Sequence, residues 1–143
     1  MANWCENDLL IKGERNDIKM FLEYVKGKQK VPGCGERPLL FDFNKIIPYP
    51  EEFNEKADAD GFSSDGYLWC IENWGSGDPV GVTIEELKGP EKNCRAKITF
   101  ATVEGPPTPI ITAAFLKFPT LEFALRSFDR SRRGLLRLSW RSV

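Results

Sequence analysis

Apolar and polar side chains alternate in several separate segments of this chain, and that alternation constrains its fold more than any other feature. A period of two residues places every second side chain on one face of a strand, so each such segment predicts a strand with one buried face. Strands buried on one face only are typical of antiparallel sheets that helices cover on that face. The segments are 7–12, 80–84, 96–102, 121–125 and 136–140.

Three other segments carry apolar residues at helical spacing. The apolar residues of 18–25 lie at positions i, i+3, i+4 and i+7, which is one face of an α-helix. A second helix is predicted from Pro109, because proline is favoured at the first helical position, and its apolar residues lie in 111–118. A shorter helix with the apolar residues of 67–74 is predicted to end at Gly75.

The order of these elements predicts the fold. It runs strand, helix, insertion, strand, strand, helix, strand, strand, and without the insertion at 28–79 it is the βαββαβ order plus one C-terminal strand. We therefore predict an α+β fold, a ferredoxin-like antiparallel sheet with two helices on one face, in a single domain over residues 1–143. Within the insertion we expect a loop at Val31–Gly35, an edge strand in Leu39–Ile47 and the short helix.

The sequence predicts a cytoplasmic protein without a membrane partner. Its first residues lack the basic and then apolar pattern of a secretory signal, and no apolar run approaches the roughly 20 residues that cross a bilayer. The four cysteines are 24 to 36 residues apart and the chain has no histidine. We therefore expect reduced, buried thiols and neither a metal site nor a disulfide.

Common catalytic machinery is also missing from the sequence. Without histidine, a Ser-His-Asp or Cys-His arrangement cannot form, and neither a Walker phosphate loop nor a dinucleotide fingerprint is present. We therefore predict that the protein is not an enzyme and needs no cofactor. Catalysis by carboxylates or by a thiol, with Cys5 and Cys70 as the thiols to test, stays open as a third alternative.

The end of the chain is strongly basic, although the net charge of the whole chain is −1. Six arginines and one aspartate lie in residues 126–143, so the rest of the chain is acidic overall. Strand alternation places three of these arginines on the outer face of the last two strands and the other three at the turn between them. The outer-face residues are Arg126, Arg137 and Arg141, and the turn residues are Arg130, Arg132 and Arg133.

Three interpretations of these arginines stay open. They can form a solvated edge that prevents aggregation between sheets. They can form a site for an acidic protein surface, or a site for nucleic acid or a nucleotide, since guanidinium groups bind phosphate well. Stacking aromatics, which accompany single-strand binding, are sparse here, with Phe128 alone nearby.

A second candidate site is an aromatic groove formed by Trp4, Asn7 and Trp74. Asn7 points inward from the first predicted strand, and an inward asparagine needs hydrogen-bond partners, of which a ligand can be one. The alternative is structural. In that case the two tryptophans fill one end of the core, because large aromatic side chains dominate small cores.

Several short motifs occur in a fixed order along most of the chain. They are Asn3-Trp4-Cys5-Glu6-Asn7, Leu9-x-Ile11-x-Gly13, Phe43-Asn44-Lys45-Ile46-Ile47-Pro48-Tyr49-Pro50, Asn73-Trp74-Gly75, Phe100-x-Thr102, Pro106-Pro107 and Phe118-Pro119. This order resembles that of the Api-type family of phage- and plasmid-borne accessory proteins. The resemblance implies a ferredoxin-like domain and a cytosolic, mobile-element setting, and it carries no established biochemical activity.

Together, the residues and the resemblance predict a small non-enzymatic binding module of a mobile genetic element. We expect this module to dock to a host or phage macromolecule, with an acidic protein surface as the partner. Nucleic-acid or nucleotide binding through the C-terminal arginine-rich hairpin is the alternative.

Overall fold

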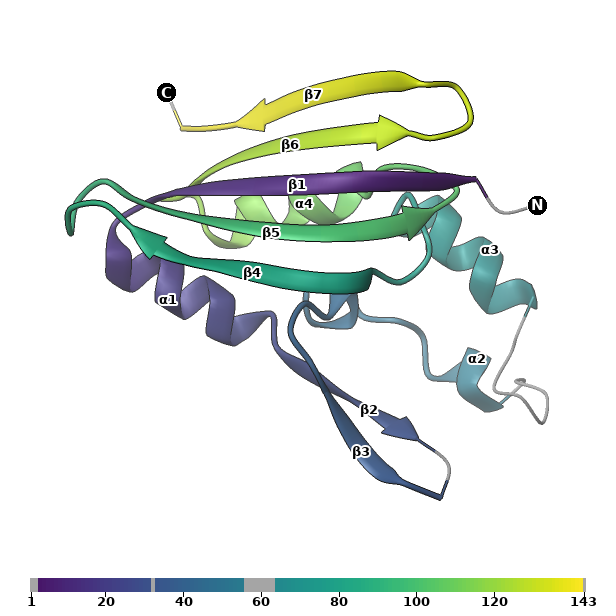
Figure 1. The fold of residues 1–143 in the computed structure, drawn as a ribbon. Coiled ribbons are helices and arrows are strands. Elements are labelled where there is room, and N and C mark those ends of the chain that lie inside the picture. Colours follow the sequence, from purple (N-terminus) through teal and green to yellow (C-terminus); the bar gives the residue numbers. More distant parts are fainter. Residues whose placement is uncertain (1–2, 32, 56–63, 143) are drawn as a thin grey trace.

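A five-stranded antiparallel sheet is the central layer of the protein (Figure 1). The structure is a computed structural model that describes residues 3–31, 33–55 and 64–142. All four strand pairings of the sheet are antiparallel, so the predicted mixture of helices with an antiparallel sheet is confirmed. The strands lie in the order β4 (Val80–Lys88), β5 (Cys94–Val103), β1 (Trp4–Gly13), β6 (Glu122–Asp129) and β7 (Gly134–Trp140).

The helices lie on one side of this sheet. Figure 1 shows α1 (Arg15–Tyr24), α3 (Ser64–Asn73) and α4 (Thr108–Lys117) behind or beside it, whereas no helix of the described residues crosses the front. Side chains on the helix-facing side of β1 and β5 are accordingly buried, including Leu9 and Ile98 at 0% exposure. Among the described helices, none has the length and apolar character needed to span a lipid bilayer.

The buried core confirms the predicted inward faces of the central strands and of the helices α1 and α4. Alternate residues of the strands and one stripe of each helix are shielded from solvent, because periods of two and about 3.6 residues place them on one side. These residues are Leu9, Ile11, Ala96, Ile98, Phe100, Leu121, Phe123 and Leu125 in or beside the strands, and Ile18, Phe21, Val25, Ile111 and Ala114 in or beside the helices.

Helix α3 ends where the sequence predicted. Its last residue is Asn73, and Gly75 has a φ of 86°, the left-handed conformation that ends many helices. A Cβ at this position would lie 2.7 Å from Cδ of Pro109 at the start of α4. Glycine is therefore needed at position 75 for two reasons: the left-handed turn that ends α3, and the close approach of this turn to the start of α4.

The insertion after α1 contains more structure than a loop and one short helix. β2 (Gly27–Val31) and β3 (Gly35–Leu39) form a separate hairpin, which Figure 1 shows projecting away from the main sheet. The predicted Val31–Gly35 loop is therefore the tip of this hairpin, and residue 32 within it lies outside the described residues. Helix α2 (Glu52–Glu55) follows before α3.

The edge strand predicted in Leu39–Ile47 is wrong. Phe43–Lys45 form a 3₁₀ helix, η1, which the side chain of Asp42 caps. Phe43 is fully buried, and its ring meets that of Phe100 on β5 edge-to-face, with 6.2 Å between ring centroids. Packing under the sheet, which depends on distant residues, overrides the local strand pattern here.

Strand β7 is less covered than predicted. Leu136, Leu138 and Trp140 do lie on the helix-facing side, as their pairing with β6 shows. Leu136 is nevertheless 39% exposed and the other two are half-buried, because β7 lies at the edge of the sheet (Figure 1). Trp140 reaches α4, where its Nε1 donates to Oγ1 of Thr112 at 3.1 Å. The prediction that Leu136 is buried is therefore wrong.

Candidate functional site

The face of the sheet that carries no helix presents a row of polar side chains across its strands. The register places Thr99 of β5 opposite Asp8 of β1, and Asp8 opposite Arg126 of β6. Arg126 in turn lies opposite Arg137 of β7. Because directly paired residues point to the same face, these two predicted arginines are neighbours on the uncovered side.

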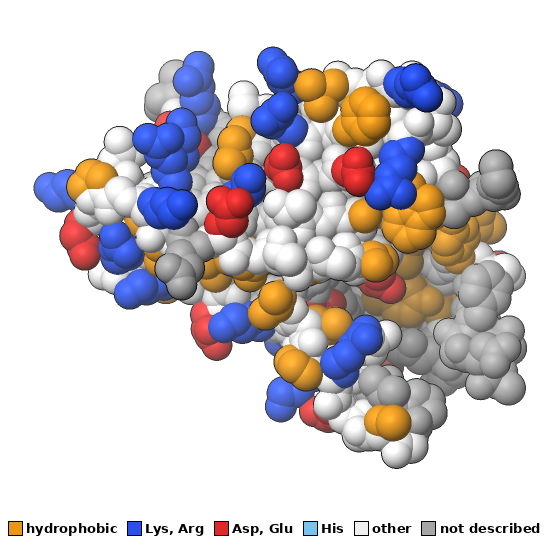
Figure 2. Space-filling view, viewed as in Figure 1, with side chains coloured by type: hydrophobic (Ala, Val, Ile, Leu, Met, Phe, Trp, Pro, Cys, Tyr) orange, Lys and Arg blue, Asp and Glu red, His pale blue; other side chains and the backbone are white. Residues whose placement is uncertain are grey.

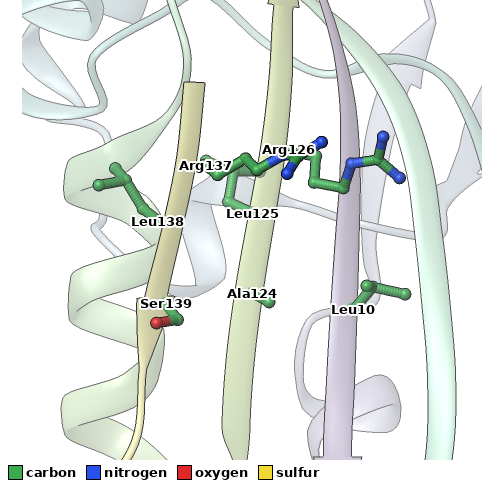
Figure 3. Close-up of a pocket in the computed structure, with 7 residues that line it drawn as sticks. All are labelled: Leu10, Ala124, Leu125, Arg126, Arg137, Leu138 and Ser139. Carbon is green, nitrogen blue, oxygen red and sulfur yellow. The ribbon is translucent and has the colours of Figure 1, made fainter. Parts of the chain in front are cut away.

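Arg126 and Arg137 border a shallow depression on this face. Figure 3 shows both side chains stretched across the strands from the β7 side toward β1. The depression has a volume of about 470 Å³, and Leu10, Ala124 and Ser139 also line it. The lining of this depression therefore combines apolar side chains, Leu10 and Ala124, with the two cationic ones.

Neither guanidinium group forms an ion pair or a side-chain hydrogen bond with another described residue. Asp8, directly opposite Arg126, instead accepts a hydrogen bond from Oγ1 of Thr99 at 3.1 Å. Like charges on directly paired residues destabilise a sheet. The Arg126–Arg137 pair thus lowers the stability of the folded state and leaves its N–H donors free for an anionic ligand.

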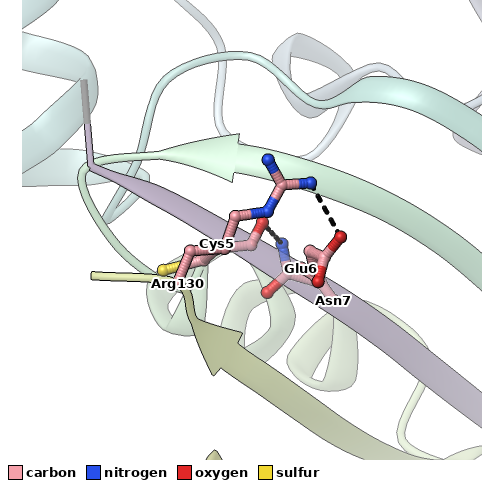
Figure 4. A network of polar contacts seen from close by, with 4 residues as sticks. All are labelled: Cys5, Glu6, Asn7 and Arg130. Atoms are coloured by element: carbon pink, nitrogen blue, oxygen red, sulfur yellow. Dashed lines mark hydrogen bonds and ion pairs between the residues drawn. The ribbon is translucent and has the colours of Figure 1, made fainter. Parts of the chain in front are cut away.

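Two other cations of this face are paired within the protein. Arg130 donates to a carboxylate oxygen of Glu6 at 2.7 Å, near the start of β1 (Figure 4). Lys97 of β5 pairs with Glu85 of β4 at 3.3 Å. On β6 and β7, Arg126 and Arg137 remain without an internal partner among the described residues. Lys12 and Arg95, directly opposite each other on β1 and β5, also lack an ion pair with a described residue, but they do not line the depression.

A second depression, of about 340 Å³, adjoins the first and shares Arg126 with it. Phe128 and Leu135 line it, lie directly opposite each other on β6 and β7, and are 37% and 48% exposed. Figure 2 views this face and shows blue cationic side chains along its β6–β7 side, with orange apolar ones between them. We call Arg126, Arg137, Phe128 and Leu135 together the arginine face.

Three of the other predicted arginines stay apart from this pair. Arg132 and Arg133 are exposed in the turn between β6 and β7, and Arg141 follows the end of β7. Asp129 holds the turn, because its carboxylate accepts the backbone N–H of Arg132 at 3.1 Å. This hydrogen bond is the main reason that the pKa of Asp129 lies below its ordinary value.

The structure does not bring Trp4, Asn7 and Trp74 together in a groove. Alternation along β1 puts the half-buried Trp4 on the uncovered face and Asn7 on the helix-facing side. Trp74 is 3% exposed, its Nε1 donates to the carbonyl of Ile47 at 2.9 Å, and its ring packs against Phe43. The structural interpretation therefore fits Trp74, which belongs to the core.

Asn7 is a buried residue with an incomplete set of hydrogen bonds. Its Nδ2 donates to Oγ1 of Thr102 at 3.0 Å, and that hydroxyl donates to the carbonyl of Gly105 at 2.7 Å. Nδ2 also approaches the carbonyl of Cys5 at 3.4 Å (Figure 4). Its Oδ1 has no partner among the described residues. An unpaired buried carbonyl of this kind costs about 1–3 kcal/mol.

Three of the four thiols are buried, as predicted, whereas Cys34 near the tip of the β2–β3 hairpin is exposed, so the prediction of buried thiols is wrong for Cys34. Burial, with a contribution from Asp78, raises the pKa of Cys70 to about 12, so this thiol stays protonated near neutral pH. Burial likewise raises the pKa of Cys5. The residues that the structure describes contain no cluster of three histidine, cysteine or carboxylate side chains placed to hold a metal ion.

Sequence reasoning identified the arginines but not the residues that complete the surface around them. Leu10 and Ala124 lie in the same depression as Arg126 and were not singled out. The strand period contained part of this signal, because every second residue of a half-buried strand faces the uncovered side. Which of those residues become neighbours depends on the register between strands, which the period does not specify.

Comparisons with known proteins add no assignment. No family model, no curated protein and no solved structure matches this chain. The Api-type resemblance therefore stays a prediction, and the geometry of the site has to carry the functional argument.

Proposed function

We propose that this protein is a non-enzymatic binding module whose arginine face docks an acidic protein surface. One observation carries the proposal: Arg126 and Arg137 lie side by side on the uncovered face, with no internal partner among the described residues. Carboxylates of a partner would relieve the repulsion between the two guanidinium groups and accept charge-assisted hydrogen bonds from both. Phe128 and Leu135 beside them add exposed apolar area for the same contact.

The composition of this face favours a protein over a nucleic acid. Single-stranded nucleic acids need several aromatic side chains for stacking, and Phe128 is the aromatic residue that lines the depression shared with Arg126. Arginine combined with aromatic and apolar side chains is typical of the centre of protein–protein interfaces.

The non-enzymatic part of the proposal is supported by the available side chains. The sequence has no histidine, so the usual proton carrier near neutral pH is missing. The buried thiols of Cys5 and Cys70 have raised pKa values, which disfavour the reactive thiolate.

We also propose that the domain is ferredoxin-like. β1, α1 and β4 form one strand–helix–strand unit with β5 lying between its two strands, and β5, α4 and β6 form a second unit with β1 between its strands. This interleaving supports a split βαβ arrangement. The Api-type resemblance supplies the cytoplasmic setting and the host or phage origin that we propose for the partner.

The proposal is tested by selecting peptides from a random library displayed on phage against the purified protein. We expect the enriched peptides to be rich in Asp and Glu. Their binding to the R126E/R137E variant should be weaker by about 100-fold or more, because each charge-assisted hydrogen bond contributes about 1.5–3 kcal/mol. The K19E/K92E variant makes the same change of charge at exposed positions of α1 and the β4–β5 turn, and it should bind like the wild type.

Enrichment of peptides without acidic residues, or equal binding to the R126E/R137E variant, would contradict the proposal. The same proteins are then measured with a labelled single-stranded oligonucleotide between about 50 and 200 mM salt. Oligonucleotide binding that weakens steeply with salt and is lost in R126E/R137E would assign the arginine face to nucleic acid instead.

A further inference from the structure

We infer that β7 binds an extended acidic segment of the partner protein as a sixth strand of the sheet. The inference rests on the proposed function and adds how the partner is held, namely by backbone hydrogen bonds along a sheet edge beside the arginine face. Three features of β7 support it: its unpaired backbone groups, its regular register and the charge around it.

The outer edge of β7 has a defined set of free backbone groups. The N–H of Arg130 donates to the carbonyl of Trp4 at 3.0 Å, so in this antiparallel register the even-numbered residues of β6 bond to β1. The odd-numbered residues of β6 therefore bond to their even-numbered partners on β7. Leu135, Arg137 and Ser139 consequently direct their N–H and carbonyl groups away from β6, toward an edge that pairs with no described strand.

The opposite edge of the sheet is irregular, whereas this edge is not. β4 contains two register irregularities against β5, and Gly81 within it has a φ of 63°. Such bulges twist an edge strand away from further pairing. β7, in contrast, pairs with β6 in continuous register from Gly134 to Trp140. β7 is therefore the edge that can accept another strand.

The charge around β7 identifies an acidic occupant. From Arg130 to the end of the sequence there are five arginines and no aspartate or glutamate. Arg137 projects onto the uncovered face, where its side chain lies over β6 toward Arg126 (Figure 3), and the residue opposite Arg137 on an added strand would face the same side. A second copy of β7 would bring its own arginines to the same place, and like charges on paired strands are destabilising. An acidic segment of another protein relieves that repulsion.

The side chains of β7 also define the spacing of this segment. An antiparallel sixth strand that continues the ladder one residue past Trp140 places residues four positions apart opposite Arg137 and Arg141, on the uncovered side, so both are expected to be acidic. The residues opposite Leu138 and Trp140 face the helix side, where Leu136 is 39% exposed. Apolar residues there would extend the core. The expected recognition core is therefore of the type Glu-Val-Thr-Val-Glu.

Backbone methylation of a peptide tests the pairing directly. The probe is a fluorescein-labelled peptide with the core Glu-Val-Thr-Val-Glu, and its affinity for the wild-type protein is measured by fluorescence anisotropy. Methylating the amide nitrogens of the threonine and the second glutamate, which face β7 in this register, should weaken binding by about tenfold or more. Methylating both valine amides, which face away from β7, is the matched control and should change the affinity by less than about threefold.

Hydrogen exchange gives a second readout on the protein itself. The amide N–H groups of Leu135, Arg137 and Ser139 should exchange at least about tenfold more slowly in the complex, because each gains a hydrogen-bonded partner. The amides of Leu136 and Leu138 already bond to β6 and should change less. Unchanged exchange at the three outer amides would argue against a sixth strand.

The outcomes separate this inference from the proposed function. One outcome is that the peptide binds the wild-type protein, binds R126E/R137E more weakly, and binds equally well with either pair of amides methylated. Docking is then by side chains alone, and the edge pairing is overturned. If acidic library peptides bind and this peptide does not, the edge pairing alone is again overturned. Binding that survives R126E/R137E, or that is equally strong when glutamine replaces both glutamates, overturns the proposed function and the inference together. A dimer in sedimentation that the peptide dissociates assigns β7 to a second copy of the chain.

Discussion

Replacing Asn7 by leucine is expected to stabilise this protein, although it removes a buried hydrogen-bonding side chain. Asn7 is 1% exposed on the helix-facing side of β1, between the buried residues Cys5 and Leu9. Its amide makes one good hydrogen bond, to Thr102, and its Oδ1 has no partner among the described residues. Leucine has the same branched shape and a similar size without the polar atoms.

The magnitude follows from three opposing contributions. Removing the unpartnered Oδ1 relieves about 1–3 kcal/mol, while losing the hydrogen bond from Nδ2 to Thr102 costs about 1 kcal/mol. Imperfect packing of the new methyl groups costs up to about 1 kcal/mol more. The net expectation is a free energy of unfolding that rises by about 1 kcal/mol, which for a chain of this length raises Tm by about 3 °C.

The assay is equilibrium unfolding in urea, followed by circular dichroism and tryptophan fluorescence, with thermal unfolding as a second measurement. Thr102→Val is the matched comparison, because it removes the hydroxyl that donates to the carbonyl of Gly105 and leaves that acceptor unpaired. This second variant should lose about 1–2 kcal/mol. The two substitutions within one hydrogen-bonded pair are thus expected to change stability in opposite directions.

A loss of more than about 1 kcal/mol in Asn7→Leu would refute the reasoning. It would mean that Oδ1 is satisfied in solution by a bound water molecule or ligand, since removal of an unpaired buried acceptor cannot cost that much. A ligand bound there would give the inward asparagine the binding role that its position in the sequence suggested.

Three further predictions concern single residues. Alkylation of the native protein, followed by mass spectrometry, should label the exposed Cys34 and spare the buried Cys70, because the pKa of Cys70, about 12, keeps its thiol protonated. Rapid labelling of both thiols would contradict the burial of Cys70. Gly75→Ala should lower the free energy of unfolding by about 1–3 kcal/mol because of its left-handed φ, whereas Gly77→Ala, with its nearest neighbouring atom at 3.8 Å, should have little effect. The Asp129→Asn variant should have a lower free energy of unfolding than the wild type at neutral pH. This difference in stability should vanish as the pH falls below 3.8, the ordinary pKa of an aspartate, because a lowered pKa contributes stability only while the carboxylate is charged. A difference that persists in acid would show that Asp129 acts through something other than its charge.

Much of the sheet could be predicted because the facing of side chains along a strand is a local property. Leu9, Ile98 and Phe123 are buried as the alternation requires, and the same alternation placed Arg126 and Arg137 on the outer side. The structure of the insertion after α1 could not be predicted from alternation, for two reasons, of which the first concerns its hairpin. The β2–β3 hairpin is largely polar and exposed, so it has no apolar alternation to reveal it.

Phe43 illustrates the second reason. Its surroundings in the sequence resemble a short strand, yet it sits in a 3₁₀ helix because its ring packs under the sheet against Phe100. The two residues are far apart in the chain, and no local pattern records their contact. A propensity gives way wherever burial against distant residues contributes more free energy than the local preference.

The sequence by itself thus determined which side of each central strand is buried, where the long helices run, and that the C-terminal arginines project outward. Only the tertiary structure decided that Arg126 and Arg137 are direct neighbours without a carboxylate partner, that Trp4 and Trp74 lie in different environments, and that Leu136 is left exposed at the edge. The reason is physical. Periodicity follows from the geometry of one strand or helix, whereas strand register and the extent of helix cover follow from contacts between residues that are distant in the chain.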